Sequence, residues 1–255
     1  MIFYPGLHQP SDAQHFDRCM VSVARLRKRK GDFNVGEWMM DSGAFMELKL
    51  FGAYRDSVSA YADQIRRWSR CGQLVAAVAQ DYMCEPFMIQ RTGLTVEAHQ
   101  RLTVERYDEL LSEETGVYIL PVLQGYEPAE YIDHIRQYGE RLEPDLIDGK
   151  LIGKWVGVGS VCKRNVDVTA IEEVLFKISE ARPDLRLHGF GVKTTALESS
   201  IVRSCLHSAD SMAWSFAARK NGRNANDWKE ADTFTTKIKN QRIKQRAYQH
   251  RMELV

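Results

Sequence analysis

The sequence predicts a parallel α/β barrel of the TIM-like (β/α)8 type, built as a single domain. Short apolar runs alternate along the chain with longer amphipathic stretches, and several runs are apolar at successive rather than alternate positions. Strands buried on both faces of a parallel sheet, joined by crossover helices, have this pattern. The length of 255 residues fits one barrel, because barrels of this class contain about 250 residues.

Seven apolar runs are the expected strands. They are Ile2–Tyr4, Trp38–Met40, Leu74–Ala79, Val117–Leu123, Trp155–Val158, Leu185–Phe190 and Ala209–Trp214. Seven strands are closer to a closed barrel than to a two-layer arrangement, and an open, doubly wound sheet is the alternative. The pattern does not identify an eighth strand.

The stretches between these runs have helical spacing. The expected helices are Ser57–Arg70, Thr95–Leu111, Pro128–Tyr138, Thr169–Ala181 and Thr195–Leu206. In the first of them, Val58, Tyr61, Ile65 and Trp68 recur at intervals of three or four residues, which places them on one face of a helix. Thr95 is a residue type that caps helix N-termini.

Basic residues are concentrated near both ends of the chain. We expect a barrel over residues 1–235 and a basic helical tail of the same domain over residues 236–255. The segment Arg219–Asp227 is polar, and a further basic run covers Arg25–Lys30. The formal net charge is only +1, so any nucleic-acid partner must be held by a local basic patch.

The composition argues against several classes of protein. The five cysteines are scattered, and no pair has C-x-x-C spacing, so neither a metal site nor a disulfide framework is expected. No apolar stretch approaches the roughly 18 residues of a membrane helix, and the N-terminus does not resemble a signal peptide. We expect an intracellular protein that needs no cofactor and no membrane.

Polar residues and glycines follow the predicted strands, where the active sites of barrels lie. The strand ends carry Asp41-Ser42-Gly43-Ala44-Phe45, Gln80-Asp81, Gln124-Gly125, Gly157-Val158-Gly159-Ser160, His188-Gly189-Phe190-Gly191 and Ser208-Ala209-Asp210-Ser211. Each Asp could instead cap a turn, and each Gly could serve a tight turn. Two carboxylates in one pocket can divide the work of nucleophile and proton carrier. Glycines allow a flat ligand to approach the backbone.

These strings resemble the motifs of the tRNA-guanine transglycosylase superfamily, in the same order from about residue 37 to 224. Asp41 to Phe45 is similar to its Asp-Ser-Gly-Gly-aromatic motif, and Gln124-Gly125 to its Gln-Gly-Gly segment. Gly157 to Ser160 and Phe190-Gly191-Val192 are similar to two of its glycine turns. Asp210 matches the Asp of its Phe-Asp-Cys motif.

The resemblance implies a role for each matching residue. Asp210 is expected to attack C1′ of the target nucleotide, and Asp41 to act as general acid and base. Asp81, Gln124 and the Gly159–Ser160 backbone are expected to read the purine edge. The base would lie between Phe45 and Phe190, with Ser42, Gly125 and Gly191 as further base-binding residues. The target base must leave its stack to enter such a slot.

Departures from the superfamily pattern change the expected polymer. The zinc module of the tRNA-acting bacterial enzymes, Cys-x-Cys-x-x-Cys…His, has no match. Ala44 replaces a motif glycine, and Phe216 stands where the superfamily has an arginine after the nucleophile. These differences favour the DpdA-like relatives, including phage-encoded ones, which insert 7-deazaguanines into DNA.

The expected function is therefore exchange of guanine in DNA for a free 7-deazaguanine of the preQ0 type, in the cytoplasm of a bacterium or of a phage-infected cell. Arg219, Lys220 and Arg223 are expected to hold the phosphates that flank the target. A tRNA-guanine transglycosylase, a non-catalytic nucleic-acid-binding barrel and a hydrolytic base-excising enzyme are the alternatives. The oligomeric state stays open, with a homodimer included.

Overall fold

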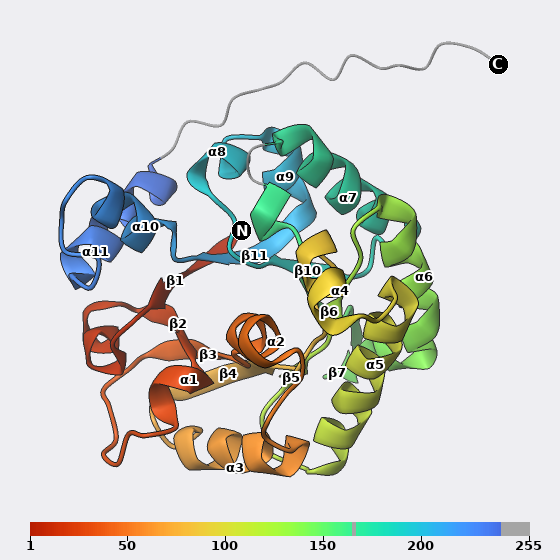
Figure 1. Ribbon diagram of the computed structural model, residues 1–255, viewed down its shortest axis with the longest axis horizontal. Coiled ribbons are helices and arrows are strands. Elements are labelled where there is room, and N and C mark those ends of the chain that lie inside the picture. Colours follow the sequence, from red (N-terminus) through yellow and green to blue (C-terminus); the bar gives the residue numbers. More distant parts are fainter. Residues whose placement is uncertain (165–166, 241–255) are drawn as a thin grey trace.

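The computed structural model describes residues 1–164 and 167–240, and its centre is a barrel of parallel strands (Figure 1). The strands are β1 (Ile2–Leu7), β2 (Arg18–Ser22), β3 (Glu37–Asp41), β4 (Gln73–Val78), β5 (Ile119–Leu120), β6 (Val122–Leu123), β9 (Trp155–Val158), β10 (Arg186–Gly189) and β11 (Leu206–Ser211). Their order in the sheet is β5-β4-β3-β2-β1-β11-β10-β9-β6, and every pairing in this sheet is parallel.

The two end strands of this sheet are halves of one strand, separated only by Pro121. β5 pairs with β4, and β6 pairs with β9 on the other side. Proline has no N–H to donate, but its carbonyl accepts a hydrogen bond from the Gly157 N–H at 2.8 Å. The nine strands thus occupy eight positions and the sheet closes on itself, which confirms the predicted barrel and rejects the open sheet.

The strand that sequence analysis did not identify is β2. Its apolar run is only Cys19–Val21, between the polar residues Arg18 and Ser22. The last predicted strand, Ala209–Trp214, has the wrong bounds. β11 begins three residues earlier and covers Leu206–Ser211, and Ala213 already begins a helix. The start of β11 contains the polar residues His207 and Ser208, which interrupt the apolar pattern.

Helices surround the barrel, and α2 lies over its opening in Figure 1. The α-helices are α1 (Val23–Leu26), α2 (Ala44–Phe51), α3 (Val58–Trp68), α4 (Pro86–Thr92), α5 (Val96–Ser112), α6 (Pro128–Tyr138), α7 (Val168–Ala181), α8 (Thr194–Leu197), α9 (Ser200–Cys205), α10 (Ala213–Lys220) and α11 (Trp228–Lys239). The 3-10 helices are η1 (Pro10–His15), η2 (Gly139–Leu142) and η3 (Cys162–Arg164). Among the described residues, no helix has the length and apolar character needed to cross a membrane.

Capping explains where these helices begin and where one prediction failed. Thr95 caps α5 as predicted, because its hydroxyl accepts a hydrogen bond from the Ala98 N–H at 3.1 Å. The single helix predicted over Thr195–Leu206 is instead two short helices, α8 and α9. The Ser199 hydroxyl accepts a hydrogen bond from the Val202 N–H and starts a new helix there, as serine does at N-cap positions.

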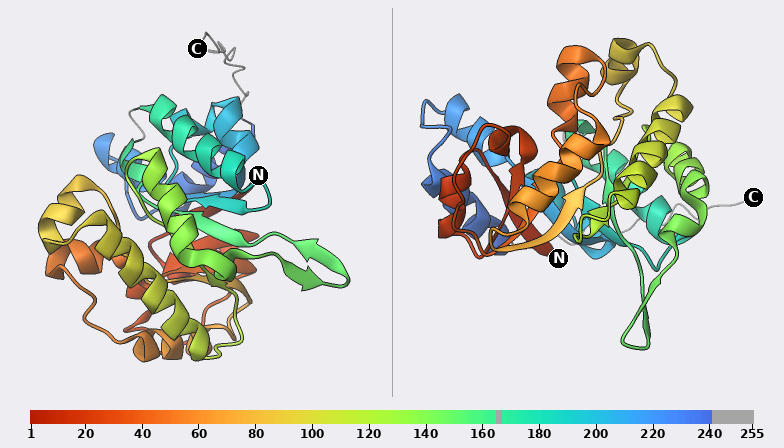
Figure 2. Two further views of the ribbon diagram at one scale, coloured as in Figure 1. Left: turned by 90° about the vertical axis from the view of Figure 1, so that its right-hand side faces the viewer. Right: turned by 90° about the horizontal axis from the view of Figure 1, so that it is seen from below.

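A two-stranded antiparallel hairpin projects from the barrel at the end opposite to α2 and α4 (Figure 2). It consists of β7 (Asp145–Ile147) and β8 (Lys150–Ile152), which sequence analysis did not predict. The predicted tail over 236–255 begins within α11, and residues 241–255 of it lie outside the described residues.

Gly72 offers a test of how tightly the barrel is packed at the start of β4. Its φ is +55°, and an added Cβ would lie 2.2 Å from the Val35 carbonyl oxygen. Gly93, at the end of α4, has a φ of +71° with open space around it. We expect Gly93→Ala to cost about 1–2 kcal/mol, the cost of a left-handed alanine, and Gly72→Ala to cost at least about 1–3 kcal/mol more because backbone must move.

Urea unfolding of the two variants beside the wild type measures this difference, since both substitutions share the left-handed penalty. Equal losses of stability would contradict the backbone clash at Gly72.

Candidate functional site

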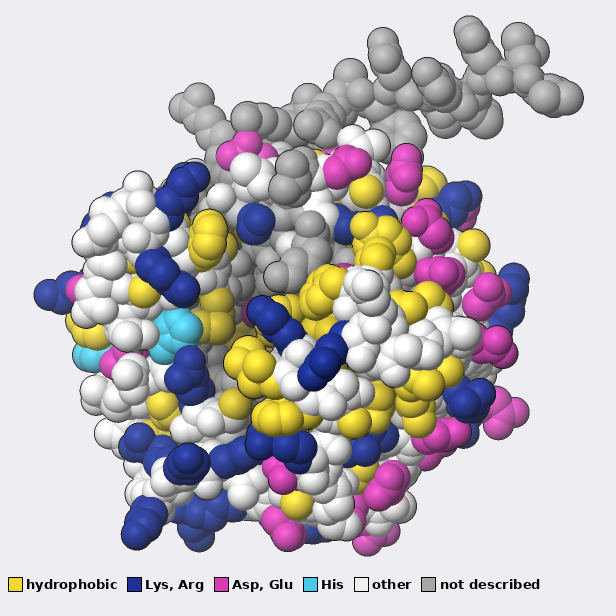
Figure 3. Space-filling model, in the orientation of Figure 1, with side chains coloured by type: hydrophobic (Ala, Val, Ile, Leu, Met, Phe, Trp, Pro, Cys, Tyr) yellow, Lys and Arg dark blue, Asp and Glu magenta, His cyan; other side chains and the backbone are white. Residues whose placement is uncertain are grey.

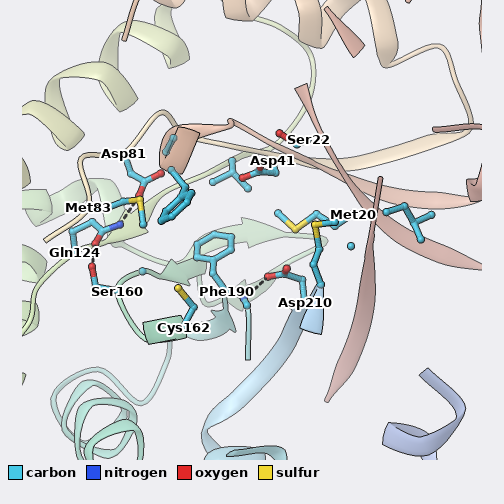
Figure 4. Close-up of a pocket in the computed structure, with 18 residues that line it drawn as sticks. Met20, Ser22, Asp41, Asp81, Met83, Gln124, Ser160, Cys162, Phe190 and Asp210 are labelled. Atoms are coloured by element: carbon cyan, nitrogen blue, oxygen red, sulfur yellow. Dashed lines mark hydrogen bonds between the residues drawn. The ribbon is translucent and has the colours of Figure 1, made fainter. Parts of the chain in front are cut away.

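A cavity of about 330 Å³ opens at the carboxyl ends of the strands (Figure 4). Its volume is within the range of small-molecule sites. The lining residues come from all eight strand positions or the loops that follow them: Gly6, Leu7, Met20, Ser22, Asp41, Ala44, Phe45, Val78, Asp81, Met83, Gln124, Gly159, Ser160, Cys162, Phe190, Gly191, Asp210 and Met212. Three of them are carboxylates, and none is Lys or Arg.

Most of the residues that the sequence singled out meet in this cavity. The predicted residues that line it are Asp41, Phe45, Asp81, Gln124, Gly159, Ser160, Phe190, Gly191 and Asp210. Ser42 and Gly125 do not line it. Ser42 is fully buried, and Gly125 packs against Glu130 and Tyr131 of α6, where an added Cβ would lie 3.0 Å from both side chains.

Asp41 is the last residue of β3, and the pairing of β2 with β3 places Ser22 beside it. Its Oδ2 accepts a hydrogen bond from the Gly43 N–H at 3.2 Å. Burial raises the pKa of Asp41, the Ser22 and Gly43 hydrogen bonds oppose this rise, and the negative charge of Asp210 adds to it. A carboxyl with a raised pKa retains a proton more readily, which suits a residue that gives and takes one.

Asp210 lies near the end of β11 and is held by the turn that follows β10. Its Oδ1 accepts a hydrogen bond from the Gly191 N–H at 3.0 Å, and its backbone carbonyl accepts one from the Val192 N–H at 3.0 Å. Gly191 has a φ of +62°, a conformation that glycine adopts without strain. This turn therefore aims a backbone donor at the carboxylate and fixes its orientation (Figure 4).

Gln124, which follows β6, links the polar groups on the opposite wall of the cavity. Its Nε2 donates a hydrogen bond to Asp81 Oδ2, and its Oε1 accepts one from the Ser160 hydroxyl at 2.8 Å. An added Cβ at Gly159 would lie 2.1 Å from Gln124 Nε2, so glycine is needed there for Gln124 to lie across the end of β9. The Gly159 N–H donates to the Leu123 carbonyl at 2.9 Å and is already engaged.

Asp81 is buried and has the most clearly perturbed carboxyl in the cavity. Burial raises its pKa to about 7; the Gln124 hydrogen bond lowers it, and the charge of Asp41 raises it further. In the part of the chain that the structure describes, no Lys or Arg lines the cavity to compensate this carboxylate. Such uncompensated, buried carboxylates are uncommon outside functional sites.

Sequence reasoning missed several lining residues. Met20 and Ser22 belong to β2, the strand that the pattern did not reveal. Once that strand is known, the rule that sites lie at strand ends would identify Ser22. Met83 lies in a loop, and Cys162 begins the short 3-10 helix η3, neither of which the sequence pattern predicts. With Met212 they make much of the lining apolar and polarizable.

A comparison with protein families supplies an independent finding. The model of a family described as DpdA, DeoxyPurine in DNA protein A, matches residues 1–237. The chain belongs to the DpdA family. A comparison with curated proteins gives no match. Membership implies a DNA-modifying transglycosylase that converts deoxyguanine to a 7-deazaguanine, and it confirms the branch that the missing zinc module favoured.

The face of this DpdA protein that carries the cavity is rich in Lys and Arg around its central hollow, whereas most Asp and Glu lie toward the edge (Figure 3). One basic group surrounds His8, just after β1. Arg25 Nη2 lies 3.1 Å from His8 Nδ1. Burial lowers the pKa of His8, and the charges of Arg25 and Arg219 lower it further, so both cations lie near this edge of the barrel.

The three predicted phosphate-binding residues lie outside the DpdA cavity. Arg219 and Lys220 are exposed on α10. Arg223 forms an ion pair with Glu230, with Nε 2.7 Å from Oε1. This arrangement leaves Arg219 and Lys220 as the better-placed pair for a phosphate, because part of the charge of Arg223 is already compensated.

The aromatic residues near this basic segment differ in exposure. Trp214 is buried and donates a hydrogen bond to the Gly6 carbonyl at 2.8 Å. Trp228 stacks on His15, with ring centroids 4.0 Å apart. Phe216 is 65% exposed, so of these three it is the one available to a base or sugar of DNA.

Among the described residues, no group of three or more His, Cys, Asp or Glu side chains is arranged to hold a metal ion.

The raised pKa of Asp81 predicts that the folding stability falls as the pH rises. An unfolded Asp titrates near about 3.9, so between about pH 4 and 7 the folded protein binds a proton that the unfolded chain releases. Folding stability is then lost as the pH rises through this range, by up to about 4 kcal/mol. We expect Asp81→Asn to remove this loss and to be more stable than the wild type at pH 8.

Thermal melting of both proteins between pH 4 and 8 tests this expectation, and the difference should shrink toward pH 4. Asp184→Asn is the control with the opposite sign. The Arg182 hydrogen bond lowers the pKa of Asp184, so that variant should be less stable at pH 8. An Asp81→Asn variant that is less stable than the wild type at pH 8 would contradict the prediction.

Proposed function

We propose that this DpdA protein exchanges guanine in DNA for a free 7-deazaguanine through a covalent intermediate on Asp210. The observation that carries the proposal is the placement of Asp41, Asp81 and Asp210 in one cavity whose lining, among the described residues, contains no Lys or Arg. A site built for structure alone would pair such carboxylates with cations. Family membership supplies the polymer and the class of base.

The reaction that fits these groups is a double displacement at C1′. An oxygen of the Asp210 carboxylate bonds to C1′ while the bond from C1′ to guanine N9 breaks, and the protonated Asp41 gives its proton to the leaving guanine. The incoming base then gives its N9 proton to Asp41, and its N9 displaces Asp210 from C1′. Atoms and charges balance, because Asp41 and Asp210 return to their starting states.

Recognition of the base is proposed for the wall that Asp81, Gln124 and Ser160 form. The N1–H and exocyclic amine of a guanine are donors, and a carboxylate such as Asp81 accepts two hydrogen bonds side by side. The aromatic rings of Phe45 and Phe190 both line the cavity, where they can contact the faces of a flat base. A preQ0-type base, with a neutral substituent at position 7, suits the apolar and sulfur-rich remainder of the lining.

The DNA strand is proposed to run over the basic face in Figure 3. Arg25, Arg219 and Lys220 are placed to contact phosphates beside the cavity, and Phe216 to contact a base or sugar next to the target. The cavity holds one flat base, so the target nucleotide must leave the duplex stack to react.

The first functional test uses duplex DNA with labelled guanine and either preQ0 or no added base. We expect release of guanine and incorporation of the deazaguanine, measured by nucleoside mass spectrometry, only when the base is present. Asp210→Ala should abolish both, and Asp41→Asn should slow exchange by about 10²- to 10⁴-fold, as loss of a general acid does. Asp133→Asn, whose residue is exposed on α6 and paired with Arg136, should match the wild type.

Other outcomes separate the alternatives. Guanine release without an added base indicates a hydrolytic enzyme, and exchange in tRNA but not in DNA indicates the tRNA-acting class. Exchange by Asp210→Ala at the wild-type rate would exclude the covalent intermediate.

The salt dependence of DNA binding tests the proposed basic contacts. Each phosphate contact with a duplex contributes about 0.9 to the slope of log K against log salt. We expect Arg219→Ala/Lys220→Ala to lower this slope by about 1–2 and to weaken binding regardless of sequence. Arg136→Ala on α6 is the matched control and should leave the slope unchanged; an equal effect there would show a diffuse attraction instead.

A further inference from the structure

His188 lies within β10, and its side chain is fully buried. The pairing of β10 with β11 places it opposite Ser208, two residues before Asp210. Its Nε2 lies 3.4 Å from Asp210 Oδ1. A buried imidazole thus faces the carboxylate to which the covalent step is assigned.

A short chain of hydrogen bonds links Trp155 and Ser208 to Nδ1 of His188. Trp155 Nε1–H donates to Ser208 Oγ at 2.8 Å, and Ser208 Oγ lies 2.9 Å from His188 Nδ1. An indole N–H can only donate, so Ser208 Oγ accepts from Trp155 and keeps its own proton, which it can donate to His188 Nδ1. In that tautomer the His188 N–H is on Nε2, the nitrogen that faces Asp210.

Nε2 of His188 has no hydrogen-bond partner in the described part of the chain. Buried polar atoms without a partner are rare, and each needs an explanation. The aromatic rings of Tyr4, Trp155 and Phe190 lie around the imidazole, with ring centroids 4.8–6.3 Å away. These rings offer no strong acceptor, and Asp210 Oδ1 lies 3.4 Å away, close enough for a hydrogen bond to form after a small movement.

Two nitrogens lie close to the same oxygen of Asp210. The Gly191 N–H donates to Oδ1 at 3.0 Å, and His188 Nε2 lies 3.4 Å from Oδ1 without forming a hydrogen bond to it. Within the described residues, no hydrogen bond is formed to Oδ2. The two oxygens of this carboxylate are consequently not equivalent.

We propose that His188 is a positioning residue that, together with the Gly191 N–H, holds Asp210 Oδ1 and presents Oδ2 to C1′. This inference rests on the proposed function and extends it by naming the attacking oxygen and the side chain that selects it. His188 exchanges no proton with the substrate and makes no bond to it; it acts through Asp210.

The chemistry of the exchange explains the use of two donors. In the second displacement the bond from Asp210 Oδ2 to C1′ breaks, and negative charge returns to the carboxylate. Donors already aimed at Oδ1 stabilise that charge as it develops, without reorganisation at the moment of reaction. The interaction of His188 with Asp210 is thus expected to affect the rate of exchange and not the binding of the base or of DNA.

The test compares two substitutions at His188 in the full chain. Phe fills the space of the imidazole without a donor, whereas the side-chain amide of Gln can donate from nearly the same position. We expect His188→Phe to lower kcat for preQ0 exchange by about 10- to 100-fold, the usual effect of losing a hydrogen bond to a charged group. The KM for preQ0 and the Kd for DNA should stay within about 2-fold, and His188→Gln should recover most of the rate.

Two further variants keep the result interpretable. His207→Phe is the matched control, because His207 packs against the same Trp155, with centroids 6.0 Å apart, but is adjacent to Ser208 rather than opposite to it. We expect its kcat to equal that of the wild type. Ser208→Ala leaves the His188 ring in place but removes the hydroxyl that fixes its tautomer, and it should lower kcat by about 3- to 10-fold.

The proposal is overturned if His188→Phe exchanges the base as fast as the wild type. It is also overturned if folded His188→Gln is as slow as His188→Phe, since the ring would then serve packing alone. If His188→Phe does not fold, the Ser208→Ala rate decides, and an unchanged kcat there counts against the proposal. Failure of the wild type to exchange any base would instead reject the proposed function.

Discussion

Closure of the parallel sheet is the constraint on which the rest of this structure depends. Closure requires the strand between β4 and β9 to pair on both sides, and it does so in two halves that meet at Pro121. Every strand then runs in the same direction around the barrel, so all of the carboxyl ends meet at one rim. Side chains separated by more than 160 residues, such as those of Asp41 and Asp210, thereby line a single cavity.

The resulting cavity holds three carboxyl groups, and its described lining contains no Lys or Arg. Within residues 1–164 and 167–240, Asp41 and Asp210 are each held by the backbone N–H of a nearby glycine, Gly43 and Gly191, and neither pairs with a Lys or Arg. Backbone donors fix a carboxylate without occupying the cavity or adding a mobile charged side chain. This arrangement has a cost in folding stability, visible in the raised pKa values of Asp41 and Asp81, and such a cost is typical of sites retained for chemistry.

The wall opposite Asp210 is organised before any ligand arrives. Gln124 is fixed through its side chain by Asp81 and Ser160, and through its backbone by His134 and Gln100. Each of these partners comes from a different loop or helix of the barrel. A recognition surface that is already ordered loses little conformational entropy when it binds a base.

The sequence by itself determined the class of fold and most of the cavity. Buried strands with successive apolar residues indicated a parallel barrel, and the rule that sites lie at strand ends located Asp41, Asp81, Gln124 and Asp210. Only the tertiary structure revealed β2 with Ser22, and the chain from Trp155 through Ser208 to His188. Local periodicity reports whether a residue is buried, but it does not report which distant residue it faces. That pairing is decided by strand register and by barrel closure, which bring together side chains that no local pattern connects.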